Sequence, residues 1–388
     1  MPKRPPALPP SGVIRAVTAI FAGSRLHPKQ VESIAHAVLG AMHADQAGVA
    51  KVGTAAARAR GTNAKHGIKQ FDRLLGNEKI VDEKALQAHV CFVVGSRARV
   101  VASLDWTEHA ADGHNRIALH LVTRHGRATP LVWKTVTDAE LTGRRNDHED
   151  DLLILFKRLL PHTVREVIIL ADRGFADVKL YQLLRDELRF HYVIRFRGCI
   201  AVQDPSIGKV ARGSDWVPSN GRARLIPNAK VTNKRFVVPA VIAVKKRRMK
   251  DSWLLASSLA WKAPEIVKLY GRRFTIEENF RDEKNPRFGM GTLNVSIAST
   301  ERRDRFTLIL AIATALLTLL GAAGEALGLD RLLRANTVKR RTHSLFRQGR
   351  EYLRGSLGKL KDAARLLRKA FVRALSTQPL FQGVFGEI

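Results

Sequence analysis

The spacing of apolar residues changes near position 99. Before it, apolar side chains recur at helical spacing, as between Val31 and Leu39, and a further helical stretch ends near Gly76. After it, three short runs rich in β-branched residues are separated by Gly, Asp and Asn turns; they cover residues 100–106, 116–123 and 128–136. The pattern predicts a helical segment over residues 1–95, followed by an antiparallel meander of three strands.

Helices and strands alternate after the meander. Residues 150–160 have a helical period, and residues 165–170 form a nearly continuous apolar run, which is typical of a buried parallel strand. A helix over residues 177–188 and a strand over residues 192–197 follow. Three strands and then alternating helix and strand predict an α/β fold, in which helices cover the faces of a sheet.

Residues 198–252 interrupt this alternation with turn-rich, strand-like sequence, which predicts an inserted β-rich subdomain. A strand resumes over residues 253–257. Residues 264–285 then predict one long helix, with Pro264 in its first turn and Pro286 ending it. The chain therefore divides into a helical segment (1–95), an α/β domain with its insertion (96–330), and a helical C-terminal region (331–388).

One apolar stretch, Phe306 to Gly324, contains no charged residue and is long enough to cross a bilayer. Its flanks mix both signs of charge, and no aromatic belt marks a membrane interface. We therefore expect a helix buried in protein, and no membrane partner.

Charge narrows the class of partner. The 66 Lys and Arg exceed the 35 Asp and Glu by 31, and the sequence pI is about 11. This excess favours a polyanion, and its spread along the whole chain favours nucleic acid over a membrane surface. A ribosomal or chromatin protein would share this charge. Five cations follow one predicted helical stretch and make residues 1–95 a candidate DNA-binding domain: Arg58, Arg60, Lys65, Lys69 and Arg73.

Residues 331–388 form a second basic region, with 14 Lys and Arg against three acidic residues. Cys91 and Cys199 give neither a disulfide framework nor a zinc spacing, which favours a reducing cytoplasm. No export signal is evident. Four histidines lie close together without completing a metal pattern, and we expect structural or surface roles for them: His109, His114, His120 and His125.

Two aspartates follow apolar runs. Asp105 ends the first strand in S-L-D-W-T, and Asp172 follows the fourth in I-L-A-D-R-G-F. Strand ends are where α/β sheets bind ligands, and a carboxylate left there needs a cation or a metal as its partner. Taken alone, each aspartate is explained equally well by a capping or turn role.

The predicted helix over residues 264–285 carries a more specific pattern. Tyr270, Arg273, Glu277 and Lys284 stand at offsets 0, 3, 7 and 14 in Y-G-R-R-F-T-I-E-E-N-F-R-D-E-K. At roughly 100° per residue they fall within about 60° of one another on a continuous helix. A tyrosine, two cations and a carboxylate in one polar stripe indicate a surface that grips phosphates beside a metal ligand.

Here the chain resembles the DDE transposases, in particular the bacterial insertion-sequence branch marked by Y-x2-R-x3-E-x6-K. That signature is matched completely. The resemblance covers about residues 98–330, and includes D-W-T at the first aspartate, D-R-G-F at the second, and a β insertion before the glutamate.

The resemblance implies an RNase H-like catalytic core in which Asp105, Asp172 and Glu277 are the catalytic metal ligands. It also implies that Tyr270, Arg273 and Lys284 contact DNA phosphates near the cleaved end. Trp253, in W-L-L-A-S-S, stands where the family has a tryptophan that stacks on a flipped base. Ala256 and Ser257 depart from the usual Leu and Thr there, so a core role for Trp253 stays open.

Carboxylates suit such chemistry because Mg²⁺ prefers hard oxygen ligands, and Mn²⁺ can substitute for it. Two ions in one site activate an attacking oxygen and stabilise the leaving one, without a covalent enzyme intermediate. The implied partners are double-stranded DNA, as terminal inverted repeats and as target, and a second copy of the chain in a homodimer. The implied location is the nucleoid of a bacterial cytoplasm.

Two other hypotheses compete with an active transposase. One is a domesticated DNA-binding protein that has lost cleavage, against which the intact triad argues. The other is a basic structural nucleic-acid-binding protein, in which the aligned stripe would be chance. Metal-dependent nicking separates the enzyme from both, and preference for one end sequence separates the remaining two.

Overall fold

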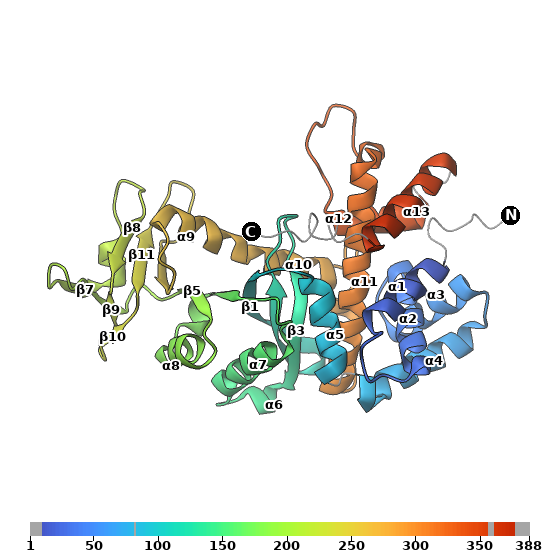
Figure 1. The fold of residues 1–388 in the computed structure, drawn as a ribbon, viewed down its shortest axis with the longest axis horizontal. Helices are drawn as coiled ribbons and strands as arrows, with labels where there is room; N and C mark the ends of the chain where they lie inside the picture. Colours follow the sequence, from blue (N-terminus) through green and yellow to red (C-terminus); the bar gives the residue numbers. More distant parts are fainter. Residues whose placement is uncertain (1–9, 81–82, 356–360, 377–388) are drawn as a thin grey trace.

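A computed structural model describes residues 10–80, 83–355 and 361–376 (Figure 1). The predicted N-terminal helices are present as α1 (Pro10–Ile20), α2 (Pro28–His43), α3 (Val49–Arg60), α4 (Ala64–Gly76) and α5 (Glu83–Val94). Helices α3 and α4 touch through glycines, since a Cβ on Gly53 would lie 2.5 Å from the Cα of Ile68. This contact brings the two backbones close together.

The predicted meander is confirmed. β1 (Arg99–His109), β2 (His114–Leu121) and β3 (Thr129–Thr137) pair antiparallel, while β4 (Glu166–Ala171) pairs parallel with β1 and β5 (His191–Arg195) parallel with β4. They belong to an eight-stranded mixed sheet of order β3-β2-β1-β4-β5-β12-β11-β8. The predicted helices beside these strands are α7 (Arg145–Leu159) and α8 (Val178–Gln182), the latter extended by a π turn over Leu183–Glu187.

The interval 198–252 is only in part a separate subdomain. Four short strands form a small sheet of their own: β6 (Ala201–Gln203), β7 (Val210–Arg212), β9 (Lys230–Val231) and β10 (Phe236–Val237). Two others, β8 (Arg224–Pro227) and β11 (Ala240–Val244), instead join the large sheet through β12 (Trp253–Ser257). All five residues of β11 are buried. A continuous apolar strand must be covered on both faces, and the large sheet provides that burial.

The expectation of one long helix over residues 264–285 is wrong. α9 (Ala263–Tyr270) and α10 (Thr275–Lys284) are separated by a 3-10 turn over Gly271–Phe274. Glycine inside a helix costs about 1 kcal/mol relative to alanine, so Gly271 weakens the helix at the point where it changes.

The uncharged stretch lies within α11 (Thr300–Ala326), which is long and apolar enough to cross a membrane by length and composition. Its most apolar window is 94% buried inside the protein, as predicted. α11 runs between the sheet and the N-terminal helices and contacts both β3 and α2 (Figure 1). The C-terminal helices α12 (Leu345–Arg354) and α13 (Lys361–Ser376) also pack on it.

Candidate active site

Strand alternation places the two aspartates on one face of the large sheet. In β1, Val101 belongs to the apolar cluster beneath α9, so Asp105, four residues further on, faces the same way. In β4, Ile168 and Leu170 belong to the same cluster, and Asp172 comes two residues after Leu170. We call this side of the sheet the carboxylate face.

The register of β1 and β4 brings the aspartates level. Leu104 pairs with Ala171, so one further step aligns Asp105 with Asp172 on strands about 4.8 Å apart. Burial raises the pKa of Asp105 to about 6; the nearby Arg273 guanidinium opposes this shift, and the negative charges of Asp172 and Glu277 add to it. Asp105 therefore lies close enough to Asp172 and to Glu277 for the negative charge of each to act on it.

Each aspartate also has a local role. The Trp106 N–H donates to Oδ1 of Asp105 at 2.9 Å, and the Gly174 N–H donates to Oδ1 of Asp172 at 2.7 Å. Asp172 thereby caps the short 3-10 helix Arg173–Phe175. The capping explanation is correct for Asp172, but each of these bonds engages only one carboxylate oxygen.

Arg273 joins Asp105 to Glu277. Its Nη1 lies 3.3 Å from Oδ2 of Asp105, and its Nη2 donates to Oε1 of Glu277. The Arg273 side chain is 6% exposed, whereas that of Glu277 is 49% exposed. A buried cation thus compensates two of the three carboxylates, and the third, Asp172, directly follows the neighbouring strand β4.

The other residues of the expected polar stripe lie in different surroundings from one another. Tyr270 is 1% exposed and packs edge-on against Trp253, with ring centroids 5.0 Å apart. Lys284 donates from Nζ to the carbonyl oxygen of Glu108 at 2.6 Å, at the end of β1. The expected single exposed stripe is therefore not formed. The 3-10 turn has fewer residues per turn than an α-helix, so it rotates Tyr270 relative to the residues of α10.

Trp253 opens β12 and is half-buried. Besides its contact with Tyr270, it stacks on Phe274 with centroids 5.8 Å apart and planes 30° apart. It lies at the edge of the cluster beneath α9 rather than inside it.

Ion pairs hold α10 against the meander. Arg116 of β2 is 1% exposed and donates to both oxygens of Glu283, at 2.8 and 2.7 Å. Arg127 donates to Asp282 at 2.7 Å and lies 3.4 Å from Glu278. These contacts fix the position of Glu277 relative to β1, and they direct its neighbour Glu278 toward Arg127.

A family model described as the transposase DDE domain matches residues 95–316, more than half of the chain. The chain belongs to the DDE transposases. The match begins just before β1 and ends inside α11, so it contains the whole carboxylate face. No curated protein matches the chain.

Sequence reasoning missed two supports of this transposase site. The Trp106 indole N–H donates to Glu149 of α7 at 2.8 Å, and the Arg145 guanidinium lies 5.1 Å from the centre of the Trp106 ring. The Ser103 hydroxyl donates to the Arg273 carbonyl oxygen at 3.4 Å. Ser103 stands two residues before Asp105, so strand alternation could have placed it on the same face of the sheet. Nothing in the sequence connects Glu149 with Trp106.

The four clustered histidines have structural surroundings in the transposase, as expected. His120 is 1% exposed, meets the Phe280 ring edge-on at 5.1 Å, and has its pKa lowered mainly by burial. His114 accepts from Nε of Arg303 at 3.0 Å. Burial lowers the pKa of His109 to about 2 and that of His125 to about 3, with nearby arginines acting in the same direction.

DDE transposase domains depend on divalent metals, and such hard cations need oxygen ligands. Within the described residues, no three His, Cys, Asp or Glu side chains meet as closely as a bound metal requires. The chemistry nevertheless fits, because hard carboxylate oxygens share one face and their charge already draws a guanidinium between two of them.

Proposed function

We propose that this DDE transposase is an active enzyme of the bacterial insertion-sequence branch. It would cleave DNA at terminal inverted repeats and join the 3′ ends to target DNA. The observation that supports the proposal is that Asp105 lies level with Asp172 across β1 and β4, while Arg273 contacts both Asp105 and Glu277.

The three carboxylates would hold two Mg²⁺ ions, or Mn²⁺, which when bound activate the attacking oxygen and stabilise the leaving one. The chain supplies the positioning. Asp105 and Asp172 stand on adjacent strands of a rigid sheet, and Glu277 stands on a helix fixed by buried ion pairs. Preorganised charge of this kind costs no rearrangement when the reaction occurs.

DNA would reach this face through the cations beside it. Arg273 and Lys284 contact backbone phosphates in the proposal, and each has a protein partner that a phosphate can replace: a carboxylate for Arg273 and a carbonyl oxygen for Lys284. Tyr270 is buried and lies close enough to Arg273 for the two side chains to interact electrostatically, so we propose that it positions the Arg273 guanidinium. The half-buried Trp253 stacks on an extruded base.

The remaining assignments belong to the same proposal. Residues 1–95 form a helical DNA-binding domain, residues 96–330 an RNase H-like catalytic domain with its β insertion, and residues 331–388 a basic helical region. A homodimer brings two ends together in the bacterial cytoplasm, at the nucleoid. The net charge of +31 supports a DNA partner for the whole chain.

The test is cleavage of a duplex that carries the inverted repeats flanking the gene. Wild-type protein should release 3′ ends in Mg²⁺ or Mn²⁺ and none in EDTA. Asp172→Asn should bind the same duplex without cutting it, because the amide keeps the shape but loses the charge that holds a metal. Absence of metal-dependent cleavage by the wild-type protein on these ends would refute the proposal.

A further inference from the structure

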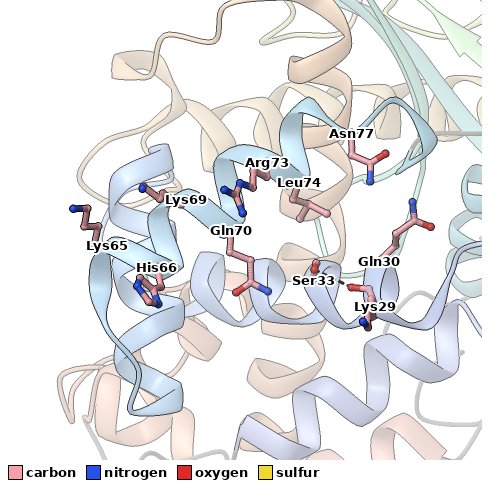
Figure 2. Close-up of a pocket in the computed structure, with 10 residues that line it drawn as sticks. All are labelled: Lys29, Gln30, Ser33, Lys65, His66, Lys69, Gln70, Arg73, Leu74 and Asn77. Atoms are coloured by element: carbon pink, nitrogen blue, oxygen red, sulfur yellow. Dashed lines mark hydrogen bonds between the residues drawn. The ribbon is translucent and has the colours of Figure 1, made fainter.

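A basic groove lies between α2 and α4, apart from the carboxylate face. It is a hollow of about 730 Å³, open to solvent. Figure 2 shows side chains from both helices along it. Its floor includes the half-buried, uncharged polar side chains of Gln30, Ser33 and Asn77. Figure 1 places both helices on the other side of α11 from the large sheet.

Exposed cations line the rim of this groove. Lys65, Lys69 and Arg73 follow one another at four-residue intervals on α4, and Lys29 extends from the first turn of α2. Side chains four residues apart share a helix face, so the three cations of α4 form one row about 12 Å long.

These cations are not compensated within the part of the chain that the structure describes. No carboxylate lines the groove there, and none of the four cations has an acidic partner within 4.0 Å among the described residues. Asp72, the one acidic residue of α4, is paired with Arg302 of α11 instead. The positive charge of the rim is therefore available to an outside partner.

The floor presents hydrogen-bond donors. Oε1 of Gln30 accepts the His27 N–H at 2.8 Å, and Oδ1 of Asn77 accepts the Lys79 N–H at 3.1 Å. With their oxygens engaged, both amides offer their amino groups. Gln70 is held in place by Arg60, whose Nη1 donates to its Oε1 at 2.8 Å. The amino groups of Gln30 and Asn77, lying beneath a rim of cations, suit a ligand that only accepts hydrogen bonds.

We propose that this groove grips the sugar-phosphate backbone of duplex DNA and supplies affinity without reading bases. Phosphate oxygens only accept hydrogen bonds, whereas base edges present donors and acceptors together. Measured along the duplex axis, a row of about 12 Å covers three or four phosphates of one strand, which rise by about 3.4 Å each. The inference rests on the proposed function, since it names one surface through which the transposase holds its DNA.

Fluorescence anisotropy tests the groove with two labelled duplexes of equal length, one carrying the end sequence and one unrelated. The variant is Lys65→Gln with Lys69→Gln. The control is Arg15→Gln with Lys51→Gln, which removes the same charge from exposed positions on α1 and α3 that do not line the groove. Melting temperatures establish that both variants are folded.

The groove variant should lose at least about tenfold in affinity at 150 mM salt, by the same factor for both duplexes. The magnitude of its slope of log K against log salt should fall by about 2, at about 0.9 for each lost phosphate contact. The control should stay close to the wild-type protein in both respects.

Three results would overturn the inference. Equal losses in variant and control would reduce the effect to net charge, and a loss confined to the end sequence would indicate base reading. Unchanged binding in the groove variant, with wild-type cleavage intact, would remove the groove and leave the proposed function standing. A wild-type protein that binds neither duplex would refute both.

Discussion

The carboxylate face and the α2/α4 groove both gather charge, but they treat their cations in opposite ways. Arg273 is buried at 6% exposure and contacts two carboxylates. Lys65, Lys69 and Arg73 are exposed and have no acidic partner within 4.0 Å among the described residues. The carboxylate face pairs its buried cation within the protein, whereas the groove leaves its exposed cations for a partner.

This difference separates two contributions to one function. A buried, paired charge fixes geometry, and losing either partner leaves a costly uncompensated charge. An exposed, unpaired charge contributes little to the geometry of the fold. It attracts a polyanion instead, and salt weakens that attraction. We therefore expect changes on the carboxylate face to affect chemistry and stability, and changes in the groove to affect DNA affinity.

The largest effect is expected for Glu277→Gln. Cleavage and strand transfer should both fall by roughly 1,000-fold or more, while end binding persists. Losing a metal ligand should exceed the 10- to 100-fold cost of losing an outer-shell partner. Gel assays on uncut and pre-cut ends measure the two steps separately. Full activity in this variant would exclude the proposed site.

Glu278→Gln is the matched control for that experiment. Glu278 pairs with Arg281 at 2.9 Å and with Arg127 at 3.4 Å. We expect Glu278→Gln to keep much of the activity. An equal loss in both variants would mean that the negative charge of α10 matters more than the position of Glu277.

Arg273→Gln should have the next largest effect. In EDTA the variant should lose about 3 kcal/mol of unfolding free energy, because Asp105 and Glu277 lose their shared counter-charge. Mg²⁺ or Mn²⁺ should stabilise the variant more than the wild-type protein. Urea unfolding with and without metal measures both effects. Identical curves for the two proteins would mean that Arg273 does not compensate the carboxylates.

A pH effect is expected at Asp304 of α11, the helix that contacts both the sheet and α2. Burial raises the pKa of Asp304 to about 7, although its side chain accepts from the Thr135 hydroxyl at 2.6 Å and from the Thr135 N–H at 3.3 Å. A folded pKa above the unfolded value favours the protonated form. The stability this provides is present below about pH 4 and is lost as pH rises to about 7.

Asp304→Asn should remove that dependence. Between pH 5 and pH 8 the unfolding free energy of the wild-type protein should fall relative to the variant by about 2 kcal/mol, at about 1.4 kcal/mol per pKa unit. Urea unfolding at the two pH values measures the difference. Parallel behaviour of the two proteins would show that Asp304 is ionised throughout.

The smallest effect is expected for Trp253→Ala. Processing of the cleaved end should slow by about tenfold, because stacking on one base is worth about 1 to 3 kcal/mol. End binding should change much less. If the variant unfolds or loses its DNA affinity, Trp253 is a core residue that serves the cluster beneath α9.

The sequence by itself determined strands β1 to β5 and β12 of the large sheet and the candidate carboxylates, whereas it assigned β8 and β11 to a separate insertion. The meander and the strand before Asp172 follow from local apolar periodicity, because the side chains of a strand alternate whatever the strand packs against. The signature containing Glu277 is likewise local. Residues close in sequence carried these predictions, so they did not depend on distant contacts.

The tertiary structure decided how those residues face one another. Gly271 and the 3-10 turn bury Tyr270 and direct Arg273 toward Asp105, which a uniform helical repeat does not anticipate. The groove joins Lys29 to a row of cations 36 to 44 residues later in the chain. Contacts between distant segments depend on how the whole fold packs, so they cannot be predicted from the local spacing of apolar residues.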